Sequence, residues 1–201
     1  AVPRAMATVA DGGAPLPLRG AAPGGRNNRM GVMPGALSDP ACFGIKLISL
    51  FPGNPAQGLS SHRGAYVLFE AETGGAVAMM DASLLTAVRT AAASAVATRA
   101  LAREDSKRLA IVGYGEQAEH HLEAMCAVRP ISRVHVAGRS ADKALAFCDI
   151  AKGKFPDIEF SAGDDVQSAV READIVCTTT ASPTPPPTTP ATPPSRWSRS
   201  R

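Results

Sequence analysis

The sequence predicts an α/β protein in which a doubly wound parallel sheet, incomplete at its C-terminal end, follows a smaller α+β domain. Residues 108–178 alternate short apolar strands with helices, which is typical of a parallel sheet with right-handed crossovers. A glycine-rich turn joins the first of these strands to its helix. The first half carries strand patterns and then one long alanine-rich helix. We therefore expect domains at 1–102 and 103–181 and a proline-rich tail at 182–201.

The first domain is expected to be mostly strands. Residues 1–40 are rich in Gly, Pro and Ala, which predicts loops or short strands and no helix. Strand composition follows at 44–50, 65–70 and 76–80, with a plausible hairpin turn at 72–75.

A long helix is predicted from Ala82 to Ala102. The segment is rich in alanine, contains no Gly or Pro, and carries apolar residues at helical spacing. Asp81 fits the N-cap, because its short acceptor side chain can bond the free N–H groups of the first turn.

The second domain is expected to contain four strands and three helices. The predicted strands are 108–112, 133–136, 158–160 and 175–178. The predicted helices are 116–128, 140–152 and 165–172, with Ser140 as the N-cap of the second.

Residues 113–118 spell GYGEQA, a G-x-G-x-x-A motif that directly follows a predicted strand and opens a predicted helix. Gly113 permits the tight turn, Gly115 lets a pyrophosphate approach the backbone, and Ala118 lets the helix pack close to the strand. The free N–H groups and positive dipole end of the helix would then hold the phosphates. The motif predicts a Rossmann-type dinucleotide-binding domain; the alternative is a plain glycine-rich turn.

The end of the second strand of this domain indicates which dinucleotide binds. In NAD binders an acidic residue there accepts hydrogen bonds from the ribose hydroxyls. Here residues 136–140 read VAGRS, with no carboxylate, and Arg139 and Ser140 offer a cation and a hydroxyl to a 2′-phosphate. We therefore favour NADP(H) over NAD(H). The alternative is that Arg139 is a solvated loop charge and Ser140 only a helix cap.

Several motifs, in the same order along the chain, resemble the ornithine cyclodeaminase/mu-crystallin family. The most diagnostic is LLTAVRTAAASA at 84–95. The others are MPGA at 33–36, GIK at 44–46, FPGNP at 51–55 and GYGEQA at 113–118. Several motifs in the correct order are much more specific than any one alone.

The resemblance runs from about Pro15 to Pro185 and implies both a fold and a chemistry. It implies a Rossmann domain and a second domain, built from both chain ends, that binds substrate and forms a homodimer. The activities of the family are ornithine cyclodeamination, alanine dehydrogenation and cyclic ketimine reduction, which share hydride exchange at an amino-acid Cα through an imine. We expect an NAD(P)-dependent enzyme acting on a small amino acid or cyclic imino acid. The alternative class is a non-catalytic, crystallin-like NADP(H)-binding protein.

Three cations correspond by position to substrate ligands of the family. Arg19 corresponds to an arginine that helps to hold the substrate carboxylate, and Arg89 offers a bidentate fork to the same group. Lys46 is expected near the α-amino or imine centre as a catalytic residue. The alternative for Arg89 is a surface charge on an amphipathic helix.

The resemblance also assigns cofactor contacts. Ser61 corresponds to a hydroxyl that contacts the cofactor. Thr178 and Thr180 correspond to threonines near the nicotinamide-side ribose. The alternative for the two threonines is that they reflect only the β propensity of threonine in a strand. The expected cofactor set is Ser61, Arg89, Thr90, Gly113, Gly115, Glu116, Gln117, Ala118, Arg139, Ser140, Thr178 and Thr180.

Charge and cysteine usage argue against several other classes. The net charge is +3, but three arginines stand among the last six residues, and the rest holds 18 basic and 18 acidic residues, so we expect no nucleic-acid partner. The four cysteines form no C-x-x-C pair and predict reduced thiols in a cytoplasmic protein. We expect no signal peptide, and because no apolar run reaches about 20 residues we expect no membrane span. His120 and His121 point in different directions on a helix, so we expect no metal site.

The C-terminal end departs from the family. Residues 182–194 hold seven prolines and precede SRWSRSR, so we expect an extended or disordered tail, or a proline-rich ligand for a partner domain. The family instead continues through two more strands and a loop whose aspartate is held to transfer the proton, and it begins with a helix that we do not expect here. A shifted reading frame would produce such a switch. Weak or absent turnover, as for an inactive fragment, is the corresponding expectation.

Overall fold

The computed structural model divides the chain into two compact units, Ala1–Arg89 (unit 1) and Thr90–Arg201 (unit 2). The residues that it describes are 2–14, 17–25, 27–180, 182 and 184. Most of the predicted proline-rich tail therefore lies outside the described residues.

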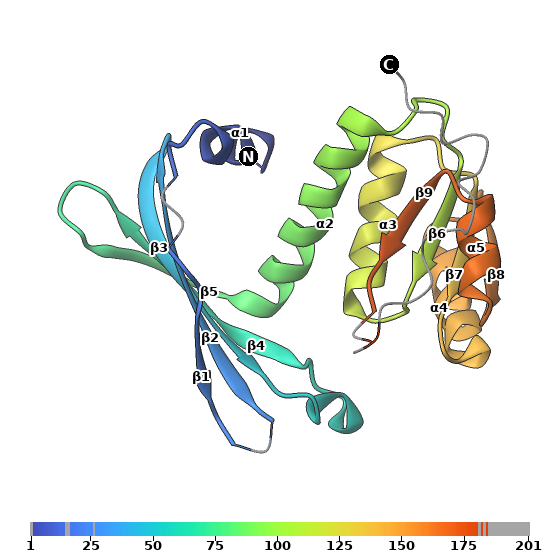
Figure 1. Cartoon of the computed structure of the whole chain (residues 1–201), viewed down its shortest axis with the longest axis horizontal. Coiled ribbons are helices and arrows are strands. Elements are labelled where there is room, and N and C mark those ends of the chain that lie inside the picture. The colour runs from blue at the N-terminus through green and yellow to red at the C-terminus, as the bar shows by residue number, and fades with distance from the viewer. Residues whose placement is uncertain (1, 15–16, 26, 181, 183, 185–201) are drawn as a thin grey trace. The chain divides into compact units, whose positions relative to one another are not determined.

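Unit 1 contains one N-terminal helix and a five-stranded antiparallel sheet (Figure 1). The strands follow their sequence order, each bonded to the next. The elements are α1 (Val2–Ala10), β1 (Gly20–Pro23), β2 (Arg29–Ser38), β3 (Ala41–Leu50), the 3-10 helix η1 (Asn54–Gln57), β4 (His62–Glu70) and β5 (Ala76–Asp81). The three strands that the sequence predicts are confirmed, and each is longer than its composition indicated.

The expectation that no helix forms in the first 40 residues is wrong. From Val2, apolar residues stand at the i, i+3, i+4 and i+7 positions of α1, which gives the helix an apolar stripe. Pro3 lies in the first turn, where its missing N–H is tolerated. Gly12 follows the helix at φ +78°, and the N–H of Gly13 donates to the carbonyl of Thr8 at 2.9 Å. The Pro and Gly that suggested helix breaking stand at the two ends, where they are compatible with a helix.

The turn between β4 and β5 is organised by one carboxylate. The side chain of Glu70 accepts hydrogen bonds from the backbone N–H groups of Glu72, Thr73 and Gly75 and from the Thr73 hydroxyl. These bonds, that of the hydroxyl first, lower the pKa of Glu70 to about 2. The predicted hairpin is confirmed.

Helix α2 (Ala82–Leu101) is the long helix that the sequence predicts, and the boundary between the two units falls inside it. The Asp81 carboxylate accepts from the backbone N–H groups of Ser83 at 2.9 Å and Leu84 at 3.1 Å. Asp81 is therefore the N-cap, as predicted.

Unit 2 contains a four-stranded parallel sheet in the order β8-β7-β6-β9. Helices α3 and α4 cover one face of this sheet, and α5 lies on the other (Figure 1). Beyond the unit's part of α2, the elements are β6 (Arg108–Val112), α3 (Glu116–Val128), β7 (Arg133–Ala137), α4 (Ala141–Lys154), β8 (Glu159–Gly163), α5 (Val166–Glu172) and β9 (Ile175–Thr178). The doubly wound parallel sheet is confirmed.

The core of unit 2 follows the alternation of its strands. Leu109, Ile111, Val134 and Val136 are each at most 1% exposed and pack against α3 and α4. Burying a side chain of this size stabilises the fold by about 1.5–3 kcal/mol. The opposite face uses alanines of the sheet and of α5, which let the helix pack close to the strands.

Arg129 ties the end of α2 to the end of α3. Arg129 is only 8% exposed. Its guanidinium donates hydrogen bonds to the backbone carbonyls of Thr98, Arg99, Ala102 and Arg103 at 2.7–2.9 Å. The C-terminal carbonyls of a helix lack intrahelical partners and carry partial negative charge. A buried cation is therefore satisfied here by backbone dipoles.

The cysteines are separate thiols. Burial raises the pKa of Cys126, Cys148 and Cys177 to about 11, so these thiols are neutral at pH 7. Among the described residues, no three His, Cys, Asp or Glu side chains are placed to hold a metal ion. The helices of the described chain also lack the combination of length and apolarity that crossing a membrane requires.

Candidate functional site

Unit 1 brings the three predicted substrate cations into electrostatic contact. Lys46 lies in the middle of β3 and is 7% exposed. Burial lowers its pKa, and the charges of Arg89 and then Arg19 lower it further. Within the described part of the chain Lys46 forms no ion pair. A buried ammonium beside two exposed guanidiniums is a site suited to an anion.

Tyr66 joins this site, although the sequence analysis did not single it out. It pairs with Lys46 across β3 and β4, and the Lys46 Nζ lies 5.8 Å from the centroid of the Tyr66 ring. This distance is within the range of a cation–π interaction. Period-2 alternation could have placed both side chains on one face only if the β3–β4 register had been known.

The glycine turn in unit 2 has a geometry that fits a diphosphate. Gly113 has φ +113°, and a Cβ there would come within 2.9 Å of the Thr179 carbonyl group. Gly115 is the N-cap of α3, so no side chain at this position caps the first N–H groups of the helix. A Cβ on Gly115 would meet nothing within 4 Å. The backbone at the start of α3 is therefore open to an anion.

The first turn of α3 holds three more of the predicted cofactor residues. Ala118 is fully buried in the core, as its role in close packing requires. The Oε1 atom of Gln117 is buried and has no hydrogen-bond partner among the described residues, a state that costs about 1–3 kcal/mol unless a donor binds there. Glu116 is exposed, and its negative charge opposes the approach of a diphosphate.

The tip of β7 carries the predicted determinants of cofactor choice. Arg139 is exposed. The Ser140 hydroxyl accepts from the Lys143 N–H at 3.4 Å and so acts as the N-cap of α4. Gly138 precedes them, and a Cβ there would lie 2.6 Å from the ring of Tyr114, a close approach that the sequence did not reveal.

The two predicted threonines lie at and just beyond the end of β9. Thr178 is the last residue of β9, pairs with Val112 and is exposed. The Oγ1 atom of Thr180 accepts a hydrogen bond from the Ser182 N–H at 3.1 Å. Thr179, which we did not predict, donates from its N–H and its hydroxyl to the Val112 carbonyl at 2.8 and 3.3 Å. Thr179 thereby holds the end of β9 against the glycine turn.

The remaining predicted cofactor residues lie in different units. Thr90 belongs to unit 2 and is half-buried in α2. Ser61 belongs to unit 1, where its hydroxyl lies 2.9 Å from the Nδ1 of His62.

His121 links α2 to the first turn of α3. Its Nδ1 lies 2.7 Å from the Gln117 carbonyl and its Nε2 lies 3.1 Å from the Ser94 Oγ. Because a carbonyl only accepts, Nδ1 carries the proton and the Ser94 hydroxyl donates to Nε2. The ring is 7% exposed and fully bonded, so it is a satisfied core histidine.

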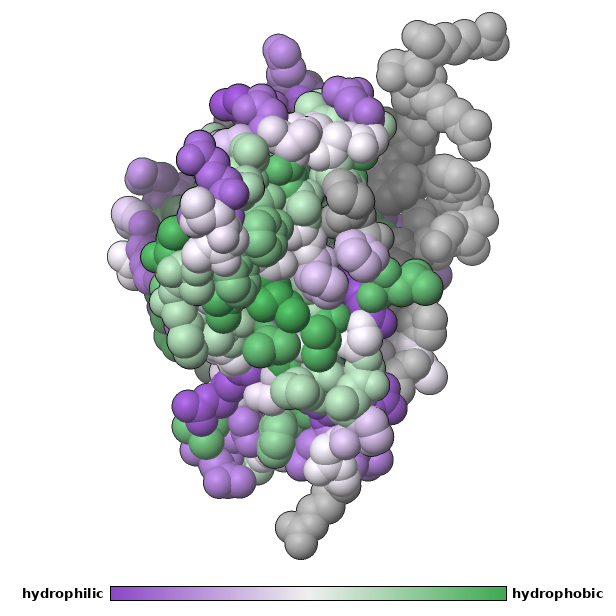
Figure 2. Space-filling model, turned by 90° about the vertical axis from the view of Figure 1, so that its left-hand side faces the viewer, coloured by the Kyte–Doolittle hydropathy of each residue, from purple (hydrophilic) through white to green (hydrophobic). Residues whose placement is uncertain are grey.

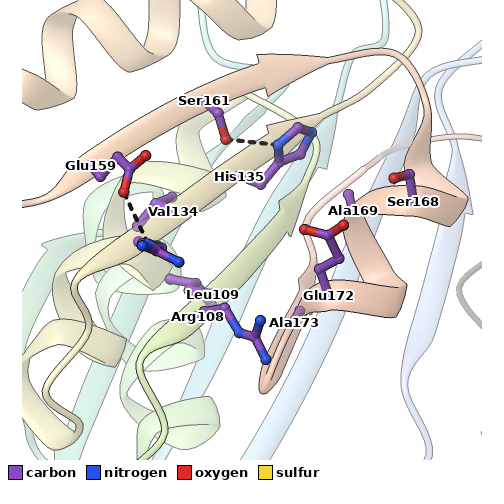
Figure 3. A pocket seen from close by; sticks show the side chains of 11 residues that line it. Arg108, Leu109, Val134, His135, Glu159, Ser161, Ser168, Ala169, Glu172 and Ala173 are labelled. Atoms are coloured by element: carbon purple, nitrogen blue, oxygen red, sulfur yellow. Dashed lines mark hydrogen bonds and ion pairs between the residues drawn. The ribbon is translucent and has the colours of Figure 1, made fainter. Parts of the chain in front are cut away.

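A pocket of about 360 Å³ lies beside α5 (Figure 3), and no residue of the glycine turn lines it. Its strand residues stand among the first three positions of β6, β7 and β8, and the others belong to α5 or follow it directly, whereas ligands of such sheets bind at the carboxyl ends of the strands. Arg133 pairs with Glu159 at 2.9 Å, and His135 bonds Ser161 at 2.8 Å (Figure 3). Because these polar groups satisfy one another, we assign the pocket no function.

The parallel sheet and its glycine turn define a Rossmann-type protein. The chain belongs to the ornithine cyclodeaminase/mu-crystallin family, whose profile it matches over residues 1–189.

Similar proteins support this assignment. Delta(1)-pyrroline-2-carboxylate reductase from Bacillus cereus is 38% identical over 170 residues, which are 84% of this chain and 52% of that relative. The solved Delta(1)-pyrroline-2-carboxylate reductase of Thermococcus litoralis, in complex with NADH and L-proline, is 35% identical with a TM-score of 0.82 over 88% of this chain and 55% of that one. An archaeal alanine dehydrogenase dimer with bound NAD is 31% identical with a TM-score of 0.80 over 89% of this chain and 54% of that one. This chain thus spans about half the length of these relatives.

Proposed function

We propose that this protein is an NADP(H)-dependent reductase of a small cyclic imino acid. The observation that carries the proposal is the buried Lys46 ammonium, which lies within the electrostatic reach of Arg89 and Arg19 and forms no ion pair in the described chain. The names of the relatives support imino-acid reduction over ornithine cyclodeamination.

The residues of unit 1 suit both parts of such a substrate. Arg89 and Arg19 bind the carboxylate, and Lys46 holds a proton at the imine nitrogen. A nicotinamide dinucleotide, when bound, supplies the hydride. In that reduction Lys46 would give its proton to the imine nitrogen, which would become the amine nitrogen, and Lys46 would regain a proton from water. A lowered pKa makes the ammonium a stronger acid and therefore a better proton donor.

The cofactor assignment is supported by the exposed Arg139 at the tip of β7, where no carboxylate stands to bind a ribose 2′-hydroxyl. The solved relatives hold NADH and NAD. Titration with NADPH and NADH tests the cofactor assignment. We expect Arg139→Ala to weaken NADPH binding about tenfold and NADH binding less than twofold, because only NADPH loses a charge-assisted hydrogen bond. The control is Arg171→Ala, at an exposed position of α5. Equal losses for both cofactors would remove the NADP(H) preference.

Reduction itself is tested by following NADPH absorbance with Delta(1)-pyrroline-2-carboxylate. Lys46→Met and Arg89→Met should each abolish the loss of NADPH absorbance. Where turnover is too weak to follow, the same variants should abolish the binding of L-proline. Release of ammonia from L-ornithine would favour the cyclodeaminase reaction instead. Tight NADPH binding without any carboxylate binding would favour a crystallin-like binding protein.

We also propose a homodimer formed through the open face of the sheet in unit 1. Alternate residues form two rows on this face, Pro34–Ile45–Val67–Met79 and Ala36–Phe43–Phe69. Met79 is 78% and Phe43 40% exposed, and Figure 2 shows apolar side chains gathered across the middle of this side of the molecule. Exposed patches of this kind mark association surfaces. Sedimentation of the wild type against Met79→Lys, with Ile150→Lys as the matched control, tests the dimer: a monomeric wild type contradicts it.

A further inference from the structure

The Lys46 site has a defined set of neighbours on its face of the sheet. The register places Met33, Lys46, Tyr66 and Met80 in one row across β2, β3, β4 and β5. Cross-strand partners project from the same face, so these four side chains are adjacent. The row consists of one cation, one aromatic ring and two thioethers.

The adjoining rows on this face are mixed, because they hold four glycines together with the apolar side chains of Ile48 and Leu68. Gly31, Gly35, Gly44 and Gly64 occupy positions next to Lys46 along its strand or in the adjoining rows. Within its own row, a ligand whose carboxylate or imine nitrogen lies at Lys46 has the side chains of Met33, Tyr66 and Met80 to contact. Tyr66 is the largest of them, and it is half-buried.

We propose that Tyr66 determines the preference of this site for a flat cyclic imino acid over an open-chain one of equal size. This inference rests on the proposed imino-acid reductase. A ring that contains a C=N bond conjugated to its carboxylate presents a flat face that can stack on the phenol ring. An open chain offers no such face and loses rotamer freedom when it is ordered.

The test uses two monocarboxylates that have the same charge and five carbon atoms each. Pyrrole-2-carboxylate is flat and cyclic, and pentanoate is an open chain. Binding of each to the full chain is measured by calorimetry or saturation-transfer NMR, with and without NADPH. We expect Tyr66→Leu to weaken pyrrole-2-carboxylate about fivefold and pentanoate less than twofold. The matched control Tyr66→Phe keeps the ring and should leave both affinities within about twofold.

The wild type provides a second measurement in case Tyr66→Leu does not fold. The ring protons of bound pyrrole-2-carboxylate should shift upfield in wild type and in Tyr66→Phe, because they lie over an aromatic face. Unshifted protons, or equal losses for both ligands in Tyr66→Leu, would overturn the role of Tyr66 while leaving the reductase proposal intact. If Lys46→Met changes neither affinity, carboxylates do not bind at Lys46, and both proposals fail.

Discussion

The two units of this chain satisfy their polar and apolar groups in opposite ways. Unit 2 buries one face of its sheet beneath α3 and α4, and its buried Arg129 is bonded to backbone carbonyls. Asp174 in the same unit accepts from the N–H groups of Lys107 and Arg108 at 3.1 and 3.0 Å. Unit 1 leaves an apolar sheet face exposed and buries Lys46, which forms no ion pair with any residue that the structure describes.

This difference indicates where each unit gains its stability. Groups that are satisfied within the chain stabilise the fold, whereas groups left unsatisfied are available to a ligand or a second subunit and cost stability until one binds. Four predictions test the comparison, from the largest expected effect to the smallest.

Arg129→Met should lower the free energy of unfolding of unit 2 by about 3 kcal/mol, because several buried carbonyls lose their donor together. Urea unfolding followed by circular dichroism measures this value. Arg99→Met, at an exposed position of α2, is the control and should change the value by less than about 0.5 kcal/mol. Similar values for the two variants would show that the α2 carbonyls do not depend on Arg129.

The two glycines of the turn should separate folding from binding. Gly113→Ala should destabilise unit 2 by about 2 kcal/mol, because its Cβ meets the Thr179 backbone and its φ is positive. Gly115→Ala should leave the melting temperature unchanged and weaken both dinucleotides, because its Cβ projects into open space. Calorimetric melting and dinucleotide titration distinguish the two. Unchanged dinucleotide affinity in Gly115→Ala would contradict a diphosphate at the turn.

Lys46→Met should stabilise unit 1 by about 1 kcal/mol at pH 7, whereas Asp174→Asn should destabilise unit 2. The pKa of Lys46 is lowered in the folded state, so its charged form costs stability below that pKa, and the cost disappears as the pH rises toward the ordinary 10.5. The stabilisation by Lys46→Met should therefore shrink over this range. Melting curves between pH 7 and 10.5 measure it. A gain that is independent of pH would assign the effect to packing instead of charge.

Glu70→Gln should have the smallest effect, confined to the β4–β5 hairpin. The pKa of Glu70 is lowered to about 2, so its contribution to stability is complete above pH 4.5 and is lost as the pH falls toward 2. Melting temperatures of the wild type and the variant should differ at pH 7 and converge near pH 2. Glu72→Gln, in the same turn, is the control. A constant difference at all pH values would exclude the carboxylate as the cause.

The sequence alone determined the local features of unit 2. The ranges 108–112, 116–128 and 175–178 match the observed elements, and the cap at Ser140, like that at Asp81 in unit 1, was predicted from a short acceptor side chain before a helical pattern. The cap at Asp165 was not predicted, because the helix was expected to begin at that residue. The helix α1 and the long strand β2 were missed because their glycines and prolines suggested loops. The sequence does not show that these residues stand at a helix end in α1 or in a strand paired with its neighbours in β2.

Only the tertiary structure decided which distant residues become neighbours. The contacts of Lys46 with Tyr66, of Thr179 with Val112, and of Ser94 with His121 join segments 20 or more residues apart. Helix and strand formation depends on periodicity and capping within a few residues, which a sequence displays directly. Strand register and helix packing depend on the whole fold, so the charge environment of Lys46 emerged only from the folded unit 1.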